Sequence, residues 1–226
     1  MEQQTDSSTP TLDTAPDAER ERGEQVILEE FGSREEFMNA LEATIKPFEE
    51  GDPARVSVLS MGSHAGTHVD APAHYLRDGA TIDEIDPDVG LGSAHVVHVE
   101  DAAIVDPEHF DDVDLESVDR LLIRTRNSPA LWHEEDFVDT FAHLSTEAAE
   151  HLAEADLDLV GIDYLSVAGY QRNETPVHRA LLEAGTWILE GLNLGGVTGG
   201  PVELACLPLK VEDCDGAPAR ALVKPE

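Results

Sequence analysis

The feature that most constrains this chain is an eleven-residue segment, HAGTHVDAPAH, at positions 64–74. It carries four potential metal ligands, which are His64, His68, Asp70 and His74. A helix does not fit, because the aspartate would lie about 240° round the axis from the first histidine. In an extended chain the four positions differ by even numbers and share one face, but a straight strand would spread them over roughly 33 Å. The chain must therefore bend, and Gly66 and Pro72 are the residues that can bend it.

Imidazole and carboxylate groups in one curved segment indicate a metal site, because zinc and manganese take these ligands. The alternative is a polar loop with several solvated histidines. A cage built from this segment alone would be closed and structural. A catalytic site needs an open position and often a second metal, so further ligands are expected elsewhere in the chain.

Two later residues suit that role. A helix is predicted with Thr175 as N-cap and Pro176 at its first position, which places His178 in the first turn. There the helix dipole disfavours a protonated imidazole and leaves the ring free to bind metal. Glu190 ends the apolar run 187–189, where an acid is costly unless it is paired or bound to metal. The alternatives are an exposed helix histidine and a surface acid at a strand end.

Charge excludes several classes of partner. The chain has 48 acidic and 14 basic residues, a formal charge of −34, so it cannot assemble the basic face that nucleic acid or an anionic membrane surface requires. It has no apolar run of about 18 residues and no apolar core in its first 25 residues, which argues against a membrane span and a secretory signal. Two cysteines fit a reducing compartment. We expect a cytoplasmic protein that acts on a small molecule.

The acid is spread along the whole chain rather than gathered in one tail. Only three lysines are present, and repulsion at this charge density destabilises a compact state unless salt screens it. We therefore hypothesise a halophilic protein that works in concentrated salt. The alternative is an acidic protein of ordinary cytoplasm.

Strands and helices mix without strict βαβ repetition, so the pattern predicts one α/β or α+β domain over residues 25–226, and we expect an α/β domain with a mixed sheet. A disordered acidic tail is predicted at 1–24. An amphipathic helix is predicted from Ser33 through Phe37, Leu41 and Ile45. A second helix, TEAAEHLAEA, follows the capping residue Ser145. The predicted strands cover residues 55–61, 95–99, 120–125, 157–162, 186–189, 202–211 and 220–223.

HAGTHVDAPAH resembles the HxGTHxDxPxH signature of the cyclase / kynurenine formamidase-like family of metal-dependent hydrolases, which also includes isatin hydrolase. The similarity extends through RLLIRT, LSTEAAEHL, LVGIDYLSV and VHRALLEAGTWILEGLNL to LPLKVEDCDGAPARALV, roughly residues 55–223. The resemblance implies a swivelling β/β/α fold and a homodimer or homotetramer. It also implies one or two divalent ions per subunit, Zn²⁺ or Mn²⁺.

Carried over by motif position, the resemblance implies a first metal bound by His64, His68 and Asp70. Asp70 would bridge to a second metal held by His178 and Glu190, and His74 would be the general base or acid. The family's aromatic–Pro-Gly-Asp turn corresponds to PFEEGD at 47–52, which makes Phe48 a candidate substrate-binding residue. Glu50 stands there where the family has proline.

The implied reaction is hydrolysis of an amide-type C–N bond, as by an arylformamidase of tryptophan catabolism. Metal-bound hydroxide would attack the carbonyl carbon, with His74 moving the proton. One alternative is a metal-dependent cyclase or an isatin- or lactone-type hydrolase. Another is a non-catalytic protein that binds a metal or ligand on the same scaffold.

Overall fold

The computed structural model describes residues 41–46, 56–134 and 136–225. They fall into two compact units, which divide between Gly62 and Ser63. The predicted acidic tail and the candidate substrate residue Phe48 lie outside the described residues. The strands are β1 (Leu41–Lys46), β2 (Val56–Met61), β3 (His68–Asp70), β4 (Leu91–Val99), β5 (Ile104–Val105), β6 (Arg120–Thr125), β7 (His143–Leu144), β8 (Leu159–Ile162), β9 (Trp187–Glu190), β10 (Gly200–Pro208) and β11 (Gly216–Pro225). The α-helices are α3 (Asn127–Ala130), α4 (Thr146–Ala153) and α5 (Glu174–Glu183).

The first unit contains an antiparallel pair of strands, β1 and β2, in which Leu41 is the partner of Met61 and Lys46 of Val56. The predicted helix through Leu41 and Ile45 is therefore wrong over residues 41–46. Apolar residues four apart share a face of a strand as well as of a helix, so their spacing does not separate the two states. Pairing with β2 decides for the strand, and residues 33–40 lie outside the described part of the chain.

The second unit is built on a closed sheet with the strand order β10-β11-β3-β9-β8-β6-β4. The pairs β4-β6, β6-β8 and β8-β9 are parallel. The other pairs of the closed sheet are antiparallel. The short strands β5 and β7 form a separate parallel pair. The α/β class and the mixed sheet are confirmed, whereas the swivelling β/β/α arrangement stays a prediction.

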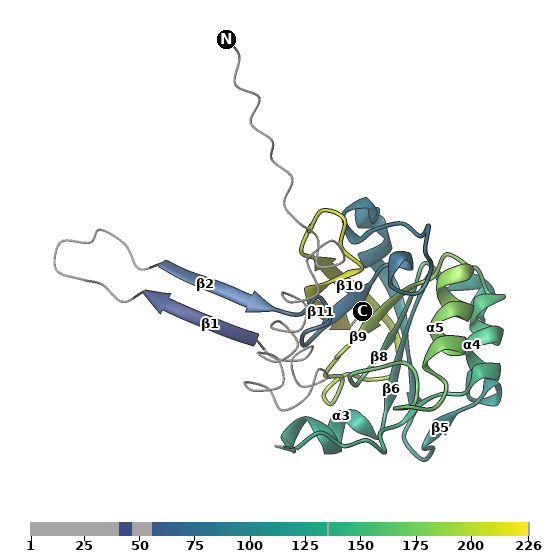
Figure 1. Ribbon diagram of the computed structural model, residues 1–226. Coiled ribbons are helices and arrows are strands. Elements are labelled where there is room, and N and C mark those ends of the chain that lie inside the picture. Colours follow the sequence, from purple (N-terminus) through teal and green to yellow (C-terminus); the bar gives the residue numbers. More distant parts are fainter. Residues whose placement is uncertain (1–40, 47–55, 135, 226) are drawn as a thin grey trace, which may run out of the picture. The chain divides into compact units, whose positions relative to one another are not determined.

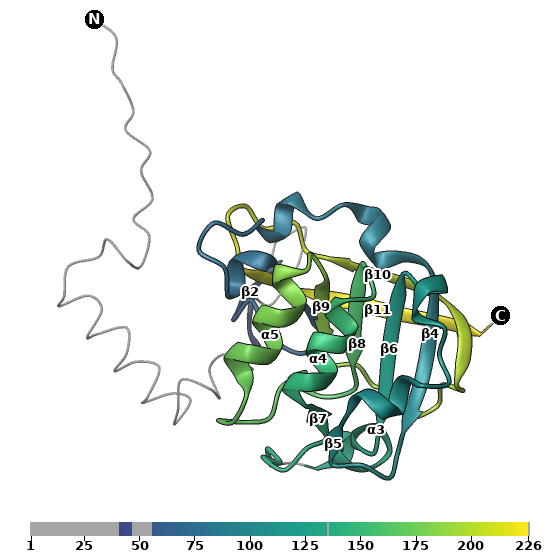
Figure 2. The same cartoon turned by 90° about the vertical axis from the view of Figure 1, so that its right-hand side faces the viewer.

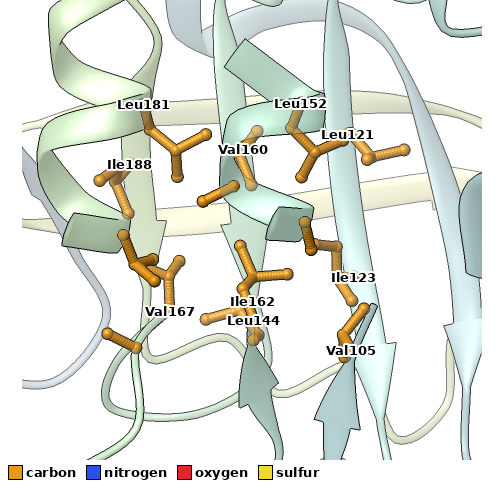
Figure 3. Close-up of a cluster of buried hydrophobic side chains, with 14 of the residues drawn as sticks. Val105, Leu121, Ile123, Leu144, Leu152, Val160, Ile162, Val167, Leu181 and Ile188 are labelled. Atoms are coloured by element: carbon orange, nitrogen blue, oxygen red, sulfur yellow. The ribbon is translucent and has the colours of Figure 1, made fainter. Parts of the chain in front are cut away.

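Two hydrophobic cores lie on the two faces of the barrel wall. Along β6, Leu121 and Ile123 belong to one core, while Leu122 between them belongs to the other. Figures 1 and 2 show α4 and α5 side by side against one face of the sheet that includes β6, β8 and β9. Leu152 of α4 and Leu181 of α5 point into the outer core there (Figure 3). Burial on both faces explains why these strands read as nearly continuous apolar runs.

The predicted start is right for one of the two long helices and displaced for the other. The hydroxyl of Ser145 accepts a hydrogen bond from Ala148 N at 3.1 Å, which confirms the predicted cap of α4. Helix α5 begins at Glu174, after Asn173, so the predicted N-cap at Thr175 is wrong by two residues. Among the described residues, no helix has the length and apolar character needed to cross a bilayer.

Candidate metal centre

Strand β3 sets the geometry of the centre. It lies between β11 and β9, and its residue His68 is the partner of Glu190 at the end of β9. His68 and Asp70 are two residues apart and share a face of the strand, while Val69 between them packs in the barrel interior. Directly opposed residues of an antiparallel pair have Cβ atoms about 5 Å apart. Pairing thus brings together ligands more than 100 residues apart in the chain.

The other predicted residues reach β3 from three directions. His178 lies on α5 and is buried together with Val177 and Leu181. His64 precedes β3 in a turn, and His74 ends a 3-10 helix, Pro72–His74, that follows it. The predicted bends are confirmed, because the glycine at 66 has φ +66° and the 3-10 helix begins at the predicted proline.

The donor atoms converge on two buried carboxylates. Nε2 of His68 lies 3.3 Å from Oδ1 of Asp70 and 3.3 Å from Oε2 of Glu190. Nε2 of His178 lies 3.3 Å from Oε1 of Glu190 and 3.7 Å from Oδ2 of Asp70. Nδ1 of His64 lies 2.7 Å from Oδ1 of Asp70. All five predicted ligands therefore surround one small volume.

The Nδ1 hydrogen bonds of His68 and His178 determine which nitrogen of each ring faces the two carboxylates. Nδ1 of His68 donates to the Gly66 carbonyl at 2.9 Å, and Nδ1 of His178 donates to the Glu174 carbonyl at 2.7 Å. A carbonyl oxygen can only accept, so each neutral ring directs the lone pair of Nε2 at a carboxylate. Nε2 of His68 and Oδ2 of Asp70 are buried and have no hydrogen-bond partner. Only a cation or additional protons can make these contacts favourable.

The donor set fits a divalent metal. Two ligand atoms at about 2.1 Å from one tetrahedral ion lie about 3.4 Å apart, close to the separations between the imidazole and carboxylate atoms here. Three triads among the described residues satisfy this requirement, and two of them, His64/His68/Asp70 and Asp70/His178/Glu190, have Asp70 in common. Backbone carbonyls that orient imidazoles through Nδ1 are also typical of metal-bound histidine.

Protons compete for the same volume. Burial opposes a charge on His64, but hydrogen bonds to Asp215 and Asp70 outweigh it and raise the pKa of His64 to about 9. Burial likewise opposes a charge on His68, whereas Asp70 and Glu190 raise the pKa of His68 to about 10. Without a cation, the centre therefore favours protonated imidazoles at neutral pH.

The two carboxylates respond in the opposite direction. Burial favours a neutral Asp70, yet the hydrogen bond with His64 and the close approach of His68 hold the pKa of Asp70 well below its usual range. Burial and the charge of Asp70 favour a neutral Glu190, but the imidazoles of His178 and His68, each 3.3 Å from a carboxylate oxygen, lower the pKa of Glu190. Both acids are thus kept ionised and able to bind a cation.

The electrostatic argument used for His178 from sequence is wrong. His178 is the fifth residue of α5, beyond the first turn in which the dipole acts. Burial opposes its charge, but the hydrogen bond with Glu190 and the charges of Glu190 and Asp70 raise the pKa of His178. Nearby carboxylates, which the local sequence does not reveal, therefore outweigh the helix terminus.

His74 lies beside the centre and is more exposed than the ligands, with 26% of its side chain accessible. Its ring centroid is 4.1 Å from that of His64 and 6.0 Å from that of His178. Its Nδ1 lies 3.3 Å from Oδ2 of Asp215. The structure therefore places His74 next to the ligands while leaving it accessible to water.

Sequence reasoning missed two residues of the centre. Asp215 contacts both His64 and His74, forming a third triad with them. Tyr75 stacks on His178 with ring centroids 4.6 Å apart, and burial with nearby acids raises the pKa of Tyr75 to about 12. The position of Tyr75 directly after His74 offered a signal. Asp215 offered only its place in an acidic turn before Gly216.

Comparison with known proteins gives the family. A family model described as "Putative cyclase" matches residues 4–168. The kynurenine formamidase of Bacillus cereus is 35% identical over 177 residues, which cover 78% of this chain and 83% of that enzyme. The chain belongs to the cyclase family. The resemblance seen in the sequence is confirmed.

Solved structures agree with this assignment. A structure described as a potential metal-dependent hydrolase with cyclase activity matches with a TM-score of 0.69 and 29% identity, covering 83% of this chain and 100% of that chain. Isatin hydrolase A from Labrenzia aggregata, solved with benzyl benzoate bound, matches with a TM-score of 0.71 and 22% identity over 82% of this chain and 83% of that one. The latter similarity shows a common fold. Together these relatives identify the chain as a hydrolase of the cyclase family with a candidate site for a divalent metal.

Proposed function

We propose that this enzyme hydrolyses the amide-type C–N bond of an N-formyl arylamine. The observation that carries the proposal is the set of imidazole lone pairs directed at two buried carboxylates, including the unpartnered Nε2 of His68 and Oδ2 of Asp70. Similarity to a kynurenine formamidase supports the choice of substrate class. The geometry of the described residues supports a metal site, and the similarity to kynurenine formamidase supports the type of reaction.

The metal would be Zn²⁺ or Mn²⁺, because both accept mixed imidazole and carboxylate ligands. His64, His68 and Asp70 would hold one ion, and Asp70, His178 and Glu190 would hold a second. When bound, a divalent ion polarises a carbonyl oxygen and lowers the pKa of a bound water from 15.7 to about 7.

His74 would move the proton. Its Nδ1 is engaged by Asp215, which leaves Nε2 to accept a proton from the attacking water. A C–O bond then forms at the formyl carbon and the C–N bond breaks. His74 returns the proton to the departing nitrogen, so that water and the N-formyl amine become the free amine and formic acid, which then loses its proton to solvent as formate.

A substrate panel tests the reaction. Metal-stripped protein is reloaded with Zn²⁺ or Mn²⁺ in concentrated KCl and assayed with N-formylkynurenine, isatin and a simple lactone. We expect turnover of N-formylkynurenine that depends on the metal. Preference for isatin or the lactone would replace this proposal with the cyclic-amide or lactone alternative. A loaded protein inert to all three would favour a binding role.

A variant tests the metal centre itself. Asp70→Asn should lose bound metal by elemental analysis, because Asp70 is the residue common to both triads. The matched control is Asp139→Asn, since Asp139 is an exposed acid outside the centre. Asp70→Asn protein that retained its full metal content would remove Asp70 from the centre.

A further inference from the structure

Asp215 lies where the chain between β10 and β11 meets the metal centre. Gly216, the first residue of β11, is the partner of Asp70, and the carbonyl oxygen of Asp215 accepts a hydrogen bond from Ala71 N at 3.0 Å. A Cβ on Gly216 would lie 2.9 Å from Cε1 of His64, so glycine is needed for the ring to pack there. Backbone pairing therefore fixes Asp215 beside the imidazoles.

Four side chains form hydrogen bonds with the Asp215 carboxylate, and the longest of these contacts is from the Cys214 thiol to Oδ1 at 3.6 Å. Its Oδ2 lies 3.1 Å from Nε2 of His64 and 3.3 Å from Nδ1 of His74, and its Oδ1 accepts from the hydroxyl of Ser63 at 3.0 Å. An ionised carboxylate can only accept, so both rings must donate to it.

Donation to Asp215 selects one tautomer in each neutral ring. His64 donates through Nε2 and so presents Nδ1 to the side of Asp70, 2.7 Å away. His74 donates through Nδ1 and keeps its lone pair on Nε2. Hydrogen bonds of this kind fix ring orientation and tautomer in metal-bound and catalytic histidines.

We propose that Asp215 is a positioning residue whose single carboxylate orients both His64 as a metal ligand and His74 as the proton carrier. This inference rests on the proposed function, because it assumes that His64 binds metal and that His74 moves a proton. The shared acceptor couples the two roles, since moving Asp215 would turn both rings. Asp215 therefore acts through its neighbours rather than on the substrate.

The first test compares Asp215→Ala and Asp215→Asn in the zinc-loaded full chain. Asp215→Ala should weaken zinc binding by 10- to 100-fold and lower kcat by a similar factor with KM unchanged. Asp215→Asn keeps one acceptor oxygen and should show a smaller loss. The control is Asp213→Asn, an exposed acid in the same turn whose φ of +56° asparagine tolerates. Thermal unfolding of each variant verifies folding.

Two further readouts separate positioning from general structural support. Nitrogen-15 NMR should show the His74 proton on Nδ1 in zinc-loaded wild type and a mixture of tautomers in Asp215→Ala. At saturating zinc, Asp215→Ala should cause no further loss of kcat in a His74→Ala background, because its effect on rate passes through His74. An unchanged tautomer, or a further tenfold loss in that background, would overturn the proposal.

The outcomes also separate this inference from the proposed function. If wild type binds zinc and hydrolyses N-formylkynurenine while Asp215→Ala changes neither zinc affinity nor the His74 tautomer, the positioning role fails and the function stands. If wild type neither binds zinc nor hydrolyses any substrate, the function fails. Ring NMR of metal-free protein at pH 10, above the His64 pKa of about 9, then decides whether Asp215 orients the two imidazoles.

Discussion

The metal centre should make the effect of zinc on stability grow as pH rises. In metal-free protein His64 and His68 have folded-state pKa values of about 9 and about 10, above the 6.5 of an unfolded chain. A raised pKa contributes stability that is fully present below pH 6.5 and is lost as pH rises through the folded value. Metal-free protein should therefore lose stability between about pH 6.5 and pH 10.

The size of this loss follows from the shift. One pKa unit corresponds to about 1.4 kcal/mol, so the shift of His64 from 6.5 to about 9 gives a loss on the order of 3 kcal/mol. His68 and His178 shift in the same direction. For a domain of this size, 3 kcal/mol lowers Tm by roughly 6–12 °C.

Bound zinc reverses the trend, because the ion requires neutral imidazoles and competes with their protons. The assay is Tm of stripped and zinc-loaded protein from pH 6 to pH 9.5 at constant high salt. The difference between the two should widen with pH, and zinc affinity should keep rising above pH 6.5. In Asp70→Asn the metal-free slope should be shallower, since Asp70 contacts both His64 and His68. A metal-free Tm that stayed flat from pH 6.5 to pH 9.5 would refute the reasoning.

Three further predictions concern single features. His74→Ala should keep its metal but lose 10²–10⁴ in kcat, with His151→Ala on the exposed face of α4 as control; unchanged turnover would exclude His74 as the proton carrier. Gly191→Ala should destabilise the fold by at least about 2 kcal/mol, because φ is +72° and a Cβ would meet the Gly66 carbonyl oxygen at 2.3 Å. Denaturant unfolding checks this against Gly196→Ala, where a Cβ meets nothing within 4 Å, and equal stability of the two would contradict it. Tm should rise strongly with KCl, and equal stability at low and multimolar KCl would end the halophilic hypothesis.

The sequence predicted correctly those elements whose formation depends on neighbouring residues. Ser145 caps α4 through its own hydroxyl, and the run at β6 is apolar because both of its faces are buried. The helix predicted through Leu41 and Ile45 failed because four-residue spacing also fits a strand, and the choice depends on a partner strand ten or more residues away. The start of α5 was displaced because Thr175-Pro176 is a plausible cap that lies inside the helix.

The part of the site whose residues lie close together in the sequence was predicted well. The part formed by residues far apart in the sequence was predicted incompletely. The segment 64–74 predicted its own bends, because glycine and proline limit the backbone directly. The electrostatics of His178 were reversed, because Glu190 and Asp70 approach it only after β9 pairs with β3. Asp215 was missed because its hydrogen bond to His64 spans 151 residues. No local pattern distinguishes that aspartate from the many others in an acidic chain.

The acidity of the chain and the chemistry of the centre respond to different variables. Ions in solution screen exposed charges over about 3 Å at 1 M salt, but they do not reach pairs that are sealed from water. Asp70 and Glu190 are buried and balanced by imidazolium protons or by a metal, so their stabilisation should depend on pH and zinc rather than on KCl. Surface repulsion should depend on KCl and hardly on zinc. Salt and metal should therefore raise Tm additively, and a strong interaction between them would place part of the acidic surface in contact with the centre.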